Sequence, residues 1–248
     1  VIFTETHLWG GEEEQTAAMR DMMTSGVYER WQMVATHTPT ADGWTGVMIW
    51  YNTEVVEAEG AAVEGAVGRV LGQRFRSRAD GEVRLVVGAY LAPKRGVDTA
   101  AQAVERAEAQ EAVELLLRAA EMAGEEAAVG GDLNAQTREA SEMWGAARTA
   151  QDDWLEDVTL EYDVAGVGGV EMTYASVAAD GTLVGRSTVD HWLLTAGLRG
   201  GAVSEVGAGV DGWQMETLPG KGHNAVWVTI PMDVEGGVAE GGAESRAT

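Results

Sequence analysis

Residues 98–124 are the segment that most limits how this chain can fold. Apolar side chains recur there with the spacing of one helical face, and Gly124 is a typical residue at a helix end. Apolar runs typical of strands flank the segment at 82–93 and 127–134. We therefore expect a long helix that packs against a sheet. The residues of its apolar face are Ala109, Val113, Leu116, Leu117 and Ala120.

Shorter patterns predict the remaining elements. The stretch 54–70 is rich in Ala, Gly and Glu and is expected to be irregular or helical. Ala-Asp-Gly at 179–181 marks a hairpin turn. Strands and helices alternate early and strands dominate late, which favours an α+β fold with two sheets face to face and helices outside. Strands are expected at 1–8, 45–52, 171–176, 187–195 and 225–231, and short helices at 11–25 and 137–148.

The chain of 248 residues is long enough for one large domain, and its composition shows no linker. We expect one domain over 1–232 and a disordered, acidic tail rich in Gly and Ala over 233–248. The sequence has no Cys, which excludes disulfides, thiolate zinc sites and Cys nucleophiles and favours an intracellular setting, cytoplasmic or nuclear. No apolar run approaches the roughly 20 residues of a membrane-spanning helix, so we expect no membrane partner.

The formal net charge of −23 limits the partners that this surface can bind. Such a surface repels nucleic acid unless a local basic patch or metal ions intervene. Basic residues cluster at 72–78, where Arg74, Arg76 and Arg78 alternate. They would either contact a backbone phosphate or lie on a solvated loop.

Four polar clusters lie where apolar runs end. They are Glu5-Thr6-His7, Asp132-Leu133-Asn134, Ser187-x-x-Asp190 and Gly222-His223. Strand ends are places where a rigid scaffold presents side chains to a cleft. In an extended segment Asp132 and Asn134 would face the same side, and the oxygens of Glu and Asp suit Mg²⁺ or Mn²⁺. An Asp beside a His can fix the tautomer of the imidazole and raise its basicity.

Taken singly, these clusters have plainer interpretations. Asp132 and Asn134 are typical of a turn in which each side chain bonds its own backbone. The residues 221–224, Lys-Gly-His-Asn, are typical of a turn before a strand. His191 adjoins Asp190 and should point to the opposite face, in the core or at the surface.

In their order along the chain, the clusters resemble the motifs of the endonuclease/exonuclease/phosphatase superfamily. That family runs Q-E-T-H, Y-x-P-N, G-D-F/L-N, S-x-I-D and S-D-H, and this chain has "TETHL", "GAYLAP", "GGDLNAQ", "STVDHWLL" and "KGHNAV". The resemblance covers 1–231, and "ETHL" and "GGDLNA" look most like the retroelement-type, apurinic-endonuclease-like members. It implies a four-layer α/β/β/α sandwich with two mixed, mainly antiparallel sheets.

The resemblance also implies an activity, which is divalent-metal-dependent hydrolysis of a phosphodiester, most simply by an endonuclease acting on nucleic acid. Glu5 would hold the cofactor, Mg²⁺ or Mn²⁺, and Asp132 would orient or activate the attacking water. The resemblance to retroelement-type members further implies a domain of a larger polyprotein that also carries a reverse transcriptase.

The remaining roles carry over in the same way. Asn134 would bind the scissile phosphate, and Tyr90 would contact it through its hydroxyl. Asp190 would orient His223, and His223 would stabilise charge on the pentacoordinate phosphorus.

The chain departs from the family pattern at three places. We expect the family's first strand, which ends in Asn, to precede Val1, and Lys94 lies near the place of a second Asn. Gly222 stands where the family has the Asp of Ser-Asp-His. Two alternatives therefore remain, a weakened or inactive domain that acts as a binding or structural module and a small-molecule phosphatase of the same fold.

Overall fold

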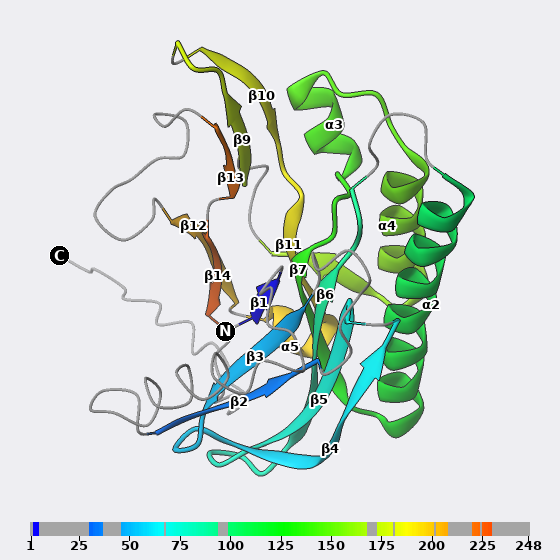
Figure 1. Ribbon diagram of the computed structural model, residues 1–248. Coiled ribbons are helices and arrows are strands. Elements are labelled where there is room, and N and C mark those ends of the chain that lie inside the picture. Colours follow the sequence, from blue (N-terminus) through cyan, green and yellow to red (C-terminus); the bar gives the residue numbers. More distant parts are fainter. Residues whose placement is uncertain are drawn as a thin grey trace, which may run out of the picture.

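The computed structural model describes residues 2–4, 30–36, 46–66, 68–93, 99–167, 173–180, 182–200, 202–207, 220–223 and 225–229. Glu5, the helix expected over 11–25 and the tail expected over 233–248 lie outside these residues. The described elements form an α+β sandwich, in which a six-stranded sheet carries helices on one face and further strands on the other (Figure 1).

The six-stranded sheet has the strand order β4-β5-β6-β7-β11-β8. β6 and β7 are parallel, and all other neighbouring strands of this sheet are antiparallel. The sheet is therefore mixed and mainly antiparallel, as predicted. The strands are β4 (Val56–Gly65), β5 (Val70–Ser77), β6 (Val83–Tyr90), β7 (Glu126–Asp132), β8 (Val164–Gly166) and β11 (Asp190–Thr195).

Helix α2 (Ala100–Ala123) is the crossover that allows β6 and β7 to be parallel. It begins at a capping box, in which Thr99 accepts from the backbone N–H of Gln102 while the side chain of Gln102 accepts from that of Thr99. It ends at Gly124, whose φ of 68° is left-handed. All five residues predicted for its apolar face are buried, which confirms the helix predicted over 98–124.

The main core lies between this helix layer and the six-stranded sheet. Leu117 of α2 and Leu155 of α4 (Ala150–Glu161) belong to one buried cluster with Leu193 of β11. Two shorter helices complete the described set, α3 (Arg138–Trp144) and α5 (Ala196–Arg199). Within the part of the chain that the structure describes, no helix combines the length and apolarity needed to cross a membrane.

Strands cover the opposite face of the six-stranded sheet. Ile49 packs there with Leu71 and Tyr90, and Val228 packs against a second cluster that contains Leu194. The order is β1-β3-β2 in one group, β12-β14 in another, and β10-β9-β13 in a third that extends beyond the end of β11 (Figure 1). The strands are β1 (Ile2–Thr4), β2 (Trp31–Ala35), β3 (Val47–Asn52), β9 (Tyr174–Val177), β10 (Leu183–Ser187), β12 (Val203–Gly207), β13 (Gly220–His223) and β14 (Ala225–Thr229).

Three local predictions are wrong. The stretch 54–70 is mostly the strand β4, and the basic cluster at 72–78 is mostly the strand β5. Lys221, Gly222 and His223 lie in the strand β13 and are not part of a turn. In each case backbone pairing with a neighbouring strand overrides weak local preferences.

Ion pairs explain how a segment rich in Ala, Gly and Glu becomes the strand β4. Arg76 pairs with Glu59 at 2.5 Å, and Arg78 pairs with Glu57 at 3.6 Å. Cross-strand pairs of opposite charge stabilise a sheet, which offsets the low strand preference of the β4 residues. The arginines predicted to contact phosphate are therefore engaged with carboxylates of the same chain.

Two glycines allow the strands to approach closely just before Asp132. Gly131 has a φ of 137°, and a Cβ built there would overlap the carbonyl oxygen of Ala89. A Cβ on Gly130 would lie 2.8 Å from the ring of Trp192, which packs across it. Gly131 is therefore required by the backbone conformation, and Gly130 is required by the packing of Trp192.

We predict that Gly131→Ala destabilises the protein, because an L-residue is strained at this φ and its Cβ meets backbone. The free energy of unfolding, measured in urea, should fall by at least about 2 kcal/mol. Gly166→Ala is the matched control, since a Cβ there meets nothing within 4 Å. Equal unfolding midpoints for the two variants would contradict this account of Gly131.

Candidate active site

Tyr90, Asp132 and Asp190 form one row across three neighbouring strands. Tyr90 is the Cα partner of Asp132 between β6 and β7, and Asp132 is the Cα partner of Asp190 between β7 and β11. Paired residues of neighbouring strands point to the same face of a sheet. Because Tyr90 packs among the side chains between the two strand layers, this row faces that layer. It lies where β6 and β7 reach their carboxyl ends.

Asp132 and Asn134 touch through a tight turn. Asp132 Oδ1 accepts from the backbone N–H of Asn134, and Asp132 Oδ2 accepts from Asn134 Nδ2, both at 2.9 Å. Asn134 has a φ of 46°, so it is left-handed, as Asn tolerates. The extended geometry expected for this segment is wrong, and the turn given as its alternative is correct for Asp132, whose side chain bonds the backbone two residues on.

The turn also ties β7 to the end of β6. Asn134 Nδ2 donates to the carbonyl oxygen of Leu91 at 2.7 Å, and the backbone N–H of Leu91 donates to the carbonyl of Asp132 at 2.9 Å. Asp132 is only 5% exposed. Its carboxylate therefore has a fixed direction.

Asp190 is anchored by Thr173, the residue before β9. Thr173 Oγ1 accepts from the backbone N–H groups of Val189 and Asp190, at 2.9 and 3.0 Å. Tyr174, which follows Thr173, is the Cα partner of His223 in β13. The backbone of His223 therefore lies at the end of the β10-β9-β13 group that adjoins Asp190. The structure describes the backbone of His223 and not its side chain.

The donors available for a divalent cation are hard oxygen ligands. Asp132 and Asp190 bring two carboxylates to paired positions, and Mg²⁺ is often held by one or two carboxylates together with waters. Within the described residues no group of three or more acidic or imidazole side chains is placed to hold a metal. Glu5 lies outside them, and the residue before it, Thr4, would be 3.1 Å from a Cβ on Gly131. The donor type thus fits the implied cofactor.

Arg69 is a site neighbour that sequence reasoning missed. Its guanidinium carbon lies 5.2 Å from the ring centre of Tyr90, and its Nε donates to Glu105 at 2.6 Å. Its carbonyl oxygen also accepts from the backbone N–H of Tyr90 at 2.8 Å. A single Arg before a strand gives no recognisable pattern, so nothing in the sequence pointed to it.

His191 lies on the other face of β11, in agreement with the prediction. It is 7% exposed, and its Nε2 lies 2.7 Å from the carbonyl oxygen of Ala135. Burial lowers the pKa of His191, against a smaller opposing effect of that hydrogen bond. The ring is therefore neutral at pH 7, and Nε2 carries the proton because a carbonyl oxygen only accepts.

The comparisons with known proteins agree in fold. No protein-family model and no curated protein matches the sequence. Among solved structures, the 3′ phosphatase NExo from Neisseria, bound to a product DNA hairpin, matches with a TM-score of 0.65 at 15% identity, over 93% of this chain and 88% of that chain. The endonuclease domain of TRAS1, a telomere-specific non-LTR retrotransposon, matches with a TM-score of 0.57 at 18% identity, over 81% and 80%.

A third match acts on a different class of compound. A mannosyl-6-phosphatase from Bacteroides thetaiotaomicron has a TM-score of 0.56 at 12% identity, over 87% of this chain and 82% of that chain. At these identities the likeness concerns the fold alone. This chain therefore has the endonuclease/exonuclease/phosphatase fold that its motifs predicted.

Proposed function

We propose that this protein is a phosphoesterase that works at the row of Tyr90, Asp132 and Asp190. One observation carries the proposal, which is that three strands distant in sequence bring these side chains into register at the carboxyl ends of β6 and β7. The shared fold of nucleases and phosphatases supports the same reaction class. The leading candidate is a phosphodiesterase that cleaves nucleic acid.

Each residue of the row has a role that its contacts support. Asp132 would orient the attacking water, since its carboxylate direction is fixed by Asn134. Asn134 would exchange one of its Nδ2 contacts for an oxygen of the scissile phosphate, a charge-assisted hydrogen bond. The hydroxyl of Tyr90 would donate to the same group.

Asp190 and His223 would act as a pair. Asp190 would accept from the imidazole of His223 and fix its orientation, and the other ring nitrogen would donate to the phosphoryl oxygens as charge develops. Glu5 would hold Mg²⁺ or Mn²⁺, as its match to the family motif implies. When bound, that cation would neutralise charge on the phosphoryl group.

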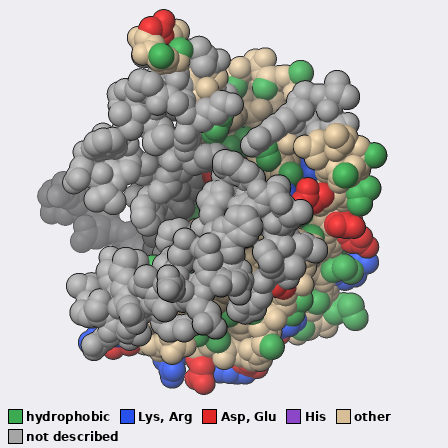
Figure 2. Space-filling view, viewed as in Figure 1, with side chains coloured by type: hydrophobic (Ala, Val, Ile, Leu, Met, Phe, Trp, Pro, Cys, Tyr) green, Lys and Arg blue, Asp and Glu red, His purple; other side chains and the backbone are tan. Residues whose placement is uncertain are grey.

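A second candidate, a small-molecule phosphatase, is favoured by the charge of the surface. The net charge is −23, and acidic and basic side chains lie next to one another along the lower edge of Figure 2. Basic side chains that would otherwise attract a nucleic-acid backbone are thereby neutralised. The described arginines that form ion pairs with carboxylates are Arg30, Arg69, Arg74, Arg76, Arg78, Arg84, Arg118, Arg138, Arg148 and Arg199.

We predict that the protein nicks supercoiled plasmid with Mg²⁺ or Mn²⁺ and that chelation by EDTA abolishes the nicking. Asp132→Asn and His223→Ala should each lower the rate by about 10²–10⁴-fold, because each removes an acid–base or charge-stabilising group. Asp163→Asn, a change at an exposed carboxylate paired with Arg199, is the control and should keep full activity. Absence of nicking by the metal-loaded wild type would rule out the nuclease.

The salt dependence of the rate separates the two substrate classes. We predict that kcat/KM for plasmid falls by less than about tenfold between 50 and 200 mM salt, whereas proteins with six to ten phosphate contacts lose about 10³–10⁵ in affinity. We expect this weak dependence because the ten described arginines named above are already paired with carboxylates of the same chain. A panel of phosphomonoesters serves as the reference, and faster turnover of these than of plasmid would favour the phosphatase. A steep loss with plasmid would instead reveal a basic binding surface.

Gly222→Asp tests whether the missing carboxylate weakens the enzyme. We predict an increase in turnover of about tenfold or more at limiting Mg²⁺, because a further hard ligand would be added near the cation. Gly185→Asp, a change on β10 of the same three-stranded group, is the matched control and should give no increase. Equal activity in wild type and Gly222→Asp would show that the departure at Gly222 has no catalytic cost.

A further inference from the structure

Buried side chains from two elements hold the backbone of the Asp-Asn turn, defined here as residues 132–136. Gln151 Nε2 donates to the carbonyl of Leu133 at 3.2 Å. His191 Nε2 donates to the carbonyl of Ala135 at 2.7 Å. Leu133 and Ala135, the residues on either side of Asn134, are thus each tied to a neighbouring element.

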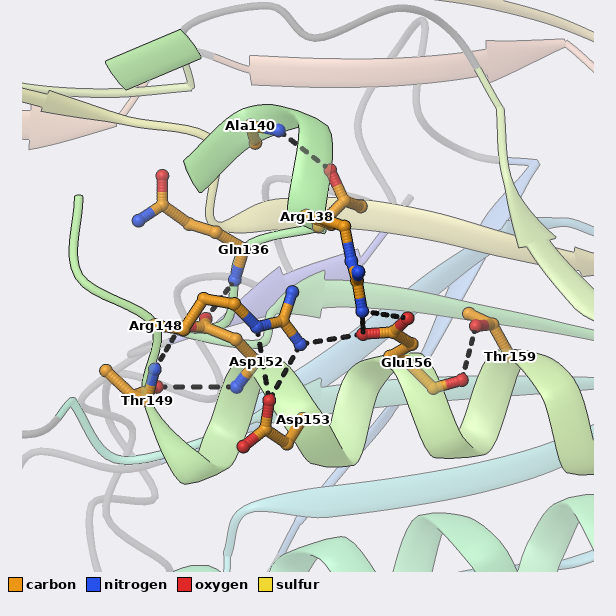
Figure 3. A network of polar contacts seen from close by, with 10 residues as sticks. Gln136, Arg138, Ala140, Arg148, Thr149, Asp152, Asp153, Glu156 and Thr159 are labelled. Carbon is orange, nitrogen blue, oxygen red and sulfur yellow. Dashed lines mark hydrogen bonds and ion pairs between the residues drawn. The ribbon is translucent and has the colours of Figure 1, made fainter. Parts of the chain in front are cut away.

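The third contact fixes the end of the turn. The backbone N–H of Gln136 donates to Asp152 Oδ1 at 2.6 Å, and Asp152 Oδ2 accepts from the backbone N–H of Thr149 at 2.6 Å (Figure 3). One carboxylate therefore caps helix α4 and holds the turn. The end of the turn and the start of α4 are thus joined through the Asp152 carboxylate.

A salt-bridge network surrounds this junction. Arg148 pairs with Asp153 at 2.7 Å and with Glu156 at 2.8 Å, and Arg138 of α3 also reaches Glu156 (Figure 3). These ion pairs join the connection between α3 and α4 to the first turns of α4. The first turns of α4, which carry Asp152, are therefore themselves held by ion pairs.

The three anchoring side chains are 3–7% exposed. Burial of a polar side chain is costly unless it is hydrogen-bonded, so such residues are found where their bonds specify a geometry. Here all three direct polar atoms at backbone groups of one short segment. That segment contains Asn134, whose backbone is left-handed.

We propose that Gln151, Asp152 and His191 are positioning residues that hold the Asp-Asn turn in its catalytic geometry. They touch neither the substrate nor the reacting atoms and act through the backbone on either side of Asn134. This inference rests on the proposed function, in which Asn134 contacts the scissile phosphate and Asp132 orients water. It adds residues from α4, which no motif of the sequence identifies.

Gln151→Leu tests the proposal, with Gln73→Leu as a closely matched control. Gln73 is 2% exposed, and its Nε2 donates to the carbonyls of Glu59 and Arg74, far from the turn. Both changes remove a buried amide that binds two backbone carbonyls, since Gln151 Nε2 also donates to the carbonyl of Ala92 at 3.4 Å. They therefore share a cost in stability and differ in whether the turn is affected.

The first measurement is amide hydrogen exchange of Asn134 and Gln136 without substrate. Gln151→Leu should speed exchange at these amides by about tenfold or more, after correction for the change in global unfolding, whereas Gln73→Leu should not. Unchanged protection in Gln151→Leu would overturn the proposal. Because this measurement uses no substrate, it decides whether the turn is anchored even if the wild type proves inactive, a result that would refute only the proposed function.

The second measurement is steady-state kinetics of the folded variants. Gln151→Leu and His191→Leu should lower kcat at least about tenfold and change KM less than threefold, because the reacting geometry is lost while other substrate contacts remain. His191→Gln keeps an N–H donor near Ala135 and should recover most of the turnover. A kcat for Gln151→Leu equal to that of Gln73→Leu, or no recovery in His191→Gln, would overturn the positioning role.

Discussion

The parallel pairing of β6 with β7 is the constraint on which the candidate site depends. Parallel neighbours need a long crossover, and the 24 residues of α2, at about 1.5 Å each, span about 36 Å. The eight residues of β6 cover only about 26 Å. The helix is therefore longer than β6 and can return the chain to the end of the sheet at which β6 and β7 both begin. Tyr90 and Asp132 consequently end their strands side by side.

The antiparallel strand β11 completes the arrangement from the opposite direction. It begins at Asp190, level with the end of β7, because the β10-β9-β13 group feeds into it at that edge. Residues that end one strand and begin another thus meet at the same rim.

Sequence patterns predicted the parts of the fold that have strong local signals. The α2 helix was predictable from its apolar face and from Gly124, and Asp132 and Asp190 stood in polar clusters where apolar runs end. Tyr90 was singled out through the family resemblance alone. The strand β4 was not predictable from its composition, because it forms through backbone pairing and ion pairs with β5, which local sequence patterns do not reveal. The anchoring roles of Gln151 and His191 could not be predicted either, because no local sequence pattern indicates which backbone group a buried polar side chain will bind.

The two edge strands of the six-stranded sheet bear on whether this protein aggregates by pairing with other chains. An exposed edge strand offers unpaired backbone groups to any other extended chain. At one edge β4 carries Glu57 and Glu59, and at the other β8 has only three residues. Ionic side chains interrupt the first edge, and the second is short, and both features disfavour pairing with another strand. The ion pairs that join β4 to β5 thus have a second consequence, which is that hydrated ionic side chains along this edge disfavour its pairing with another extended chain.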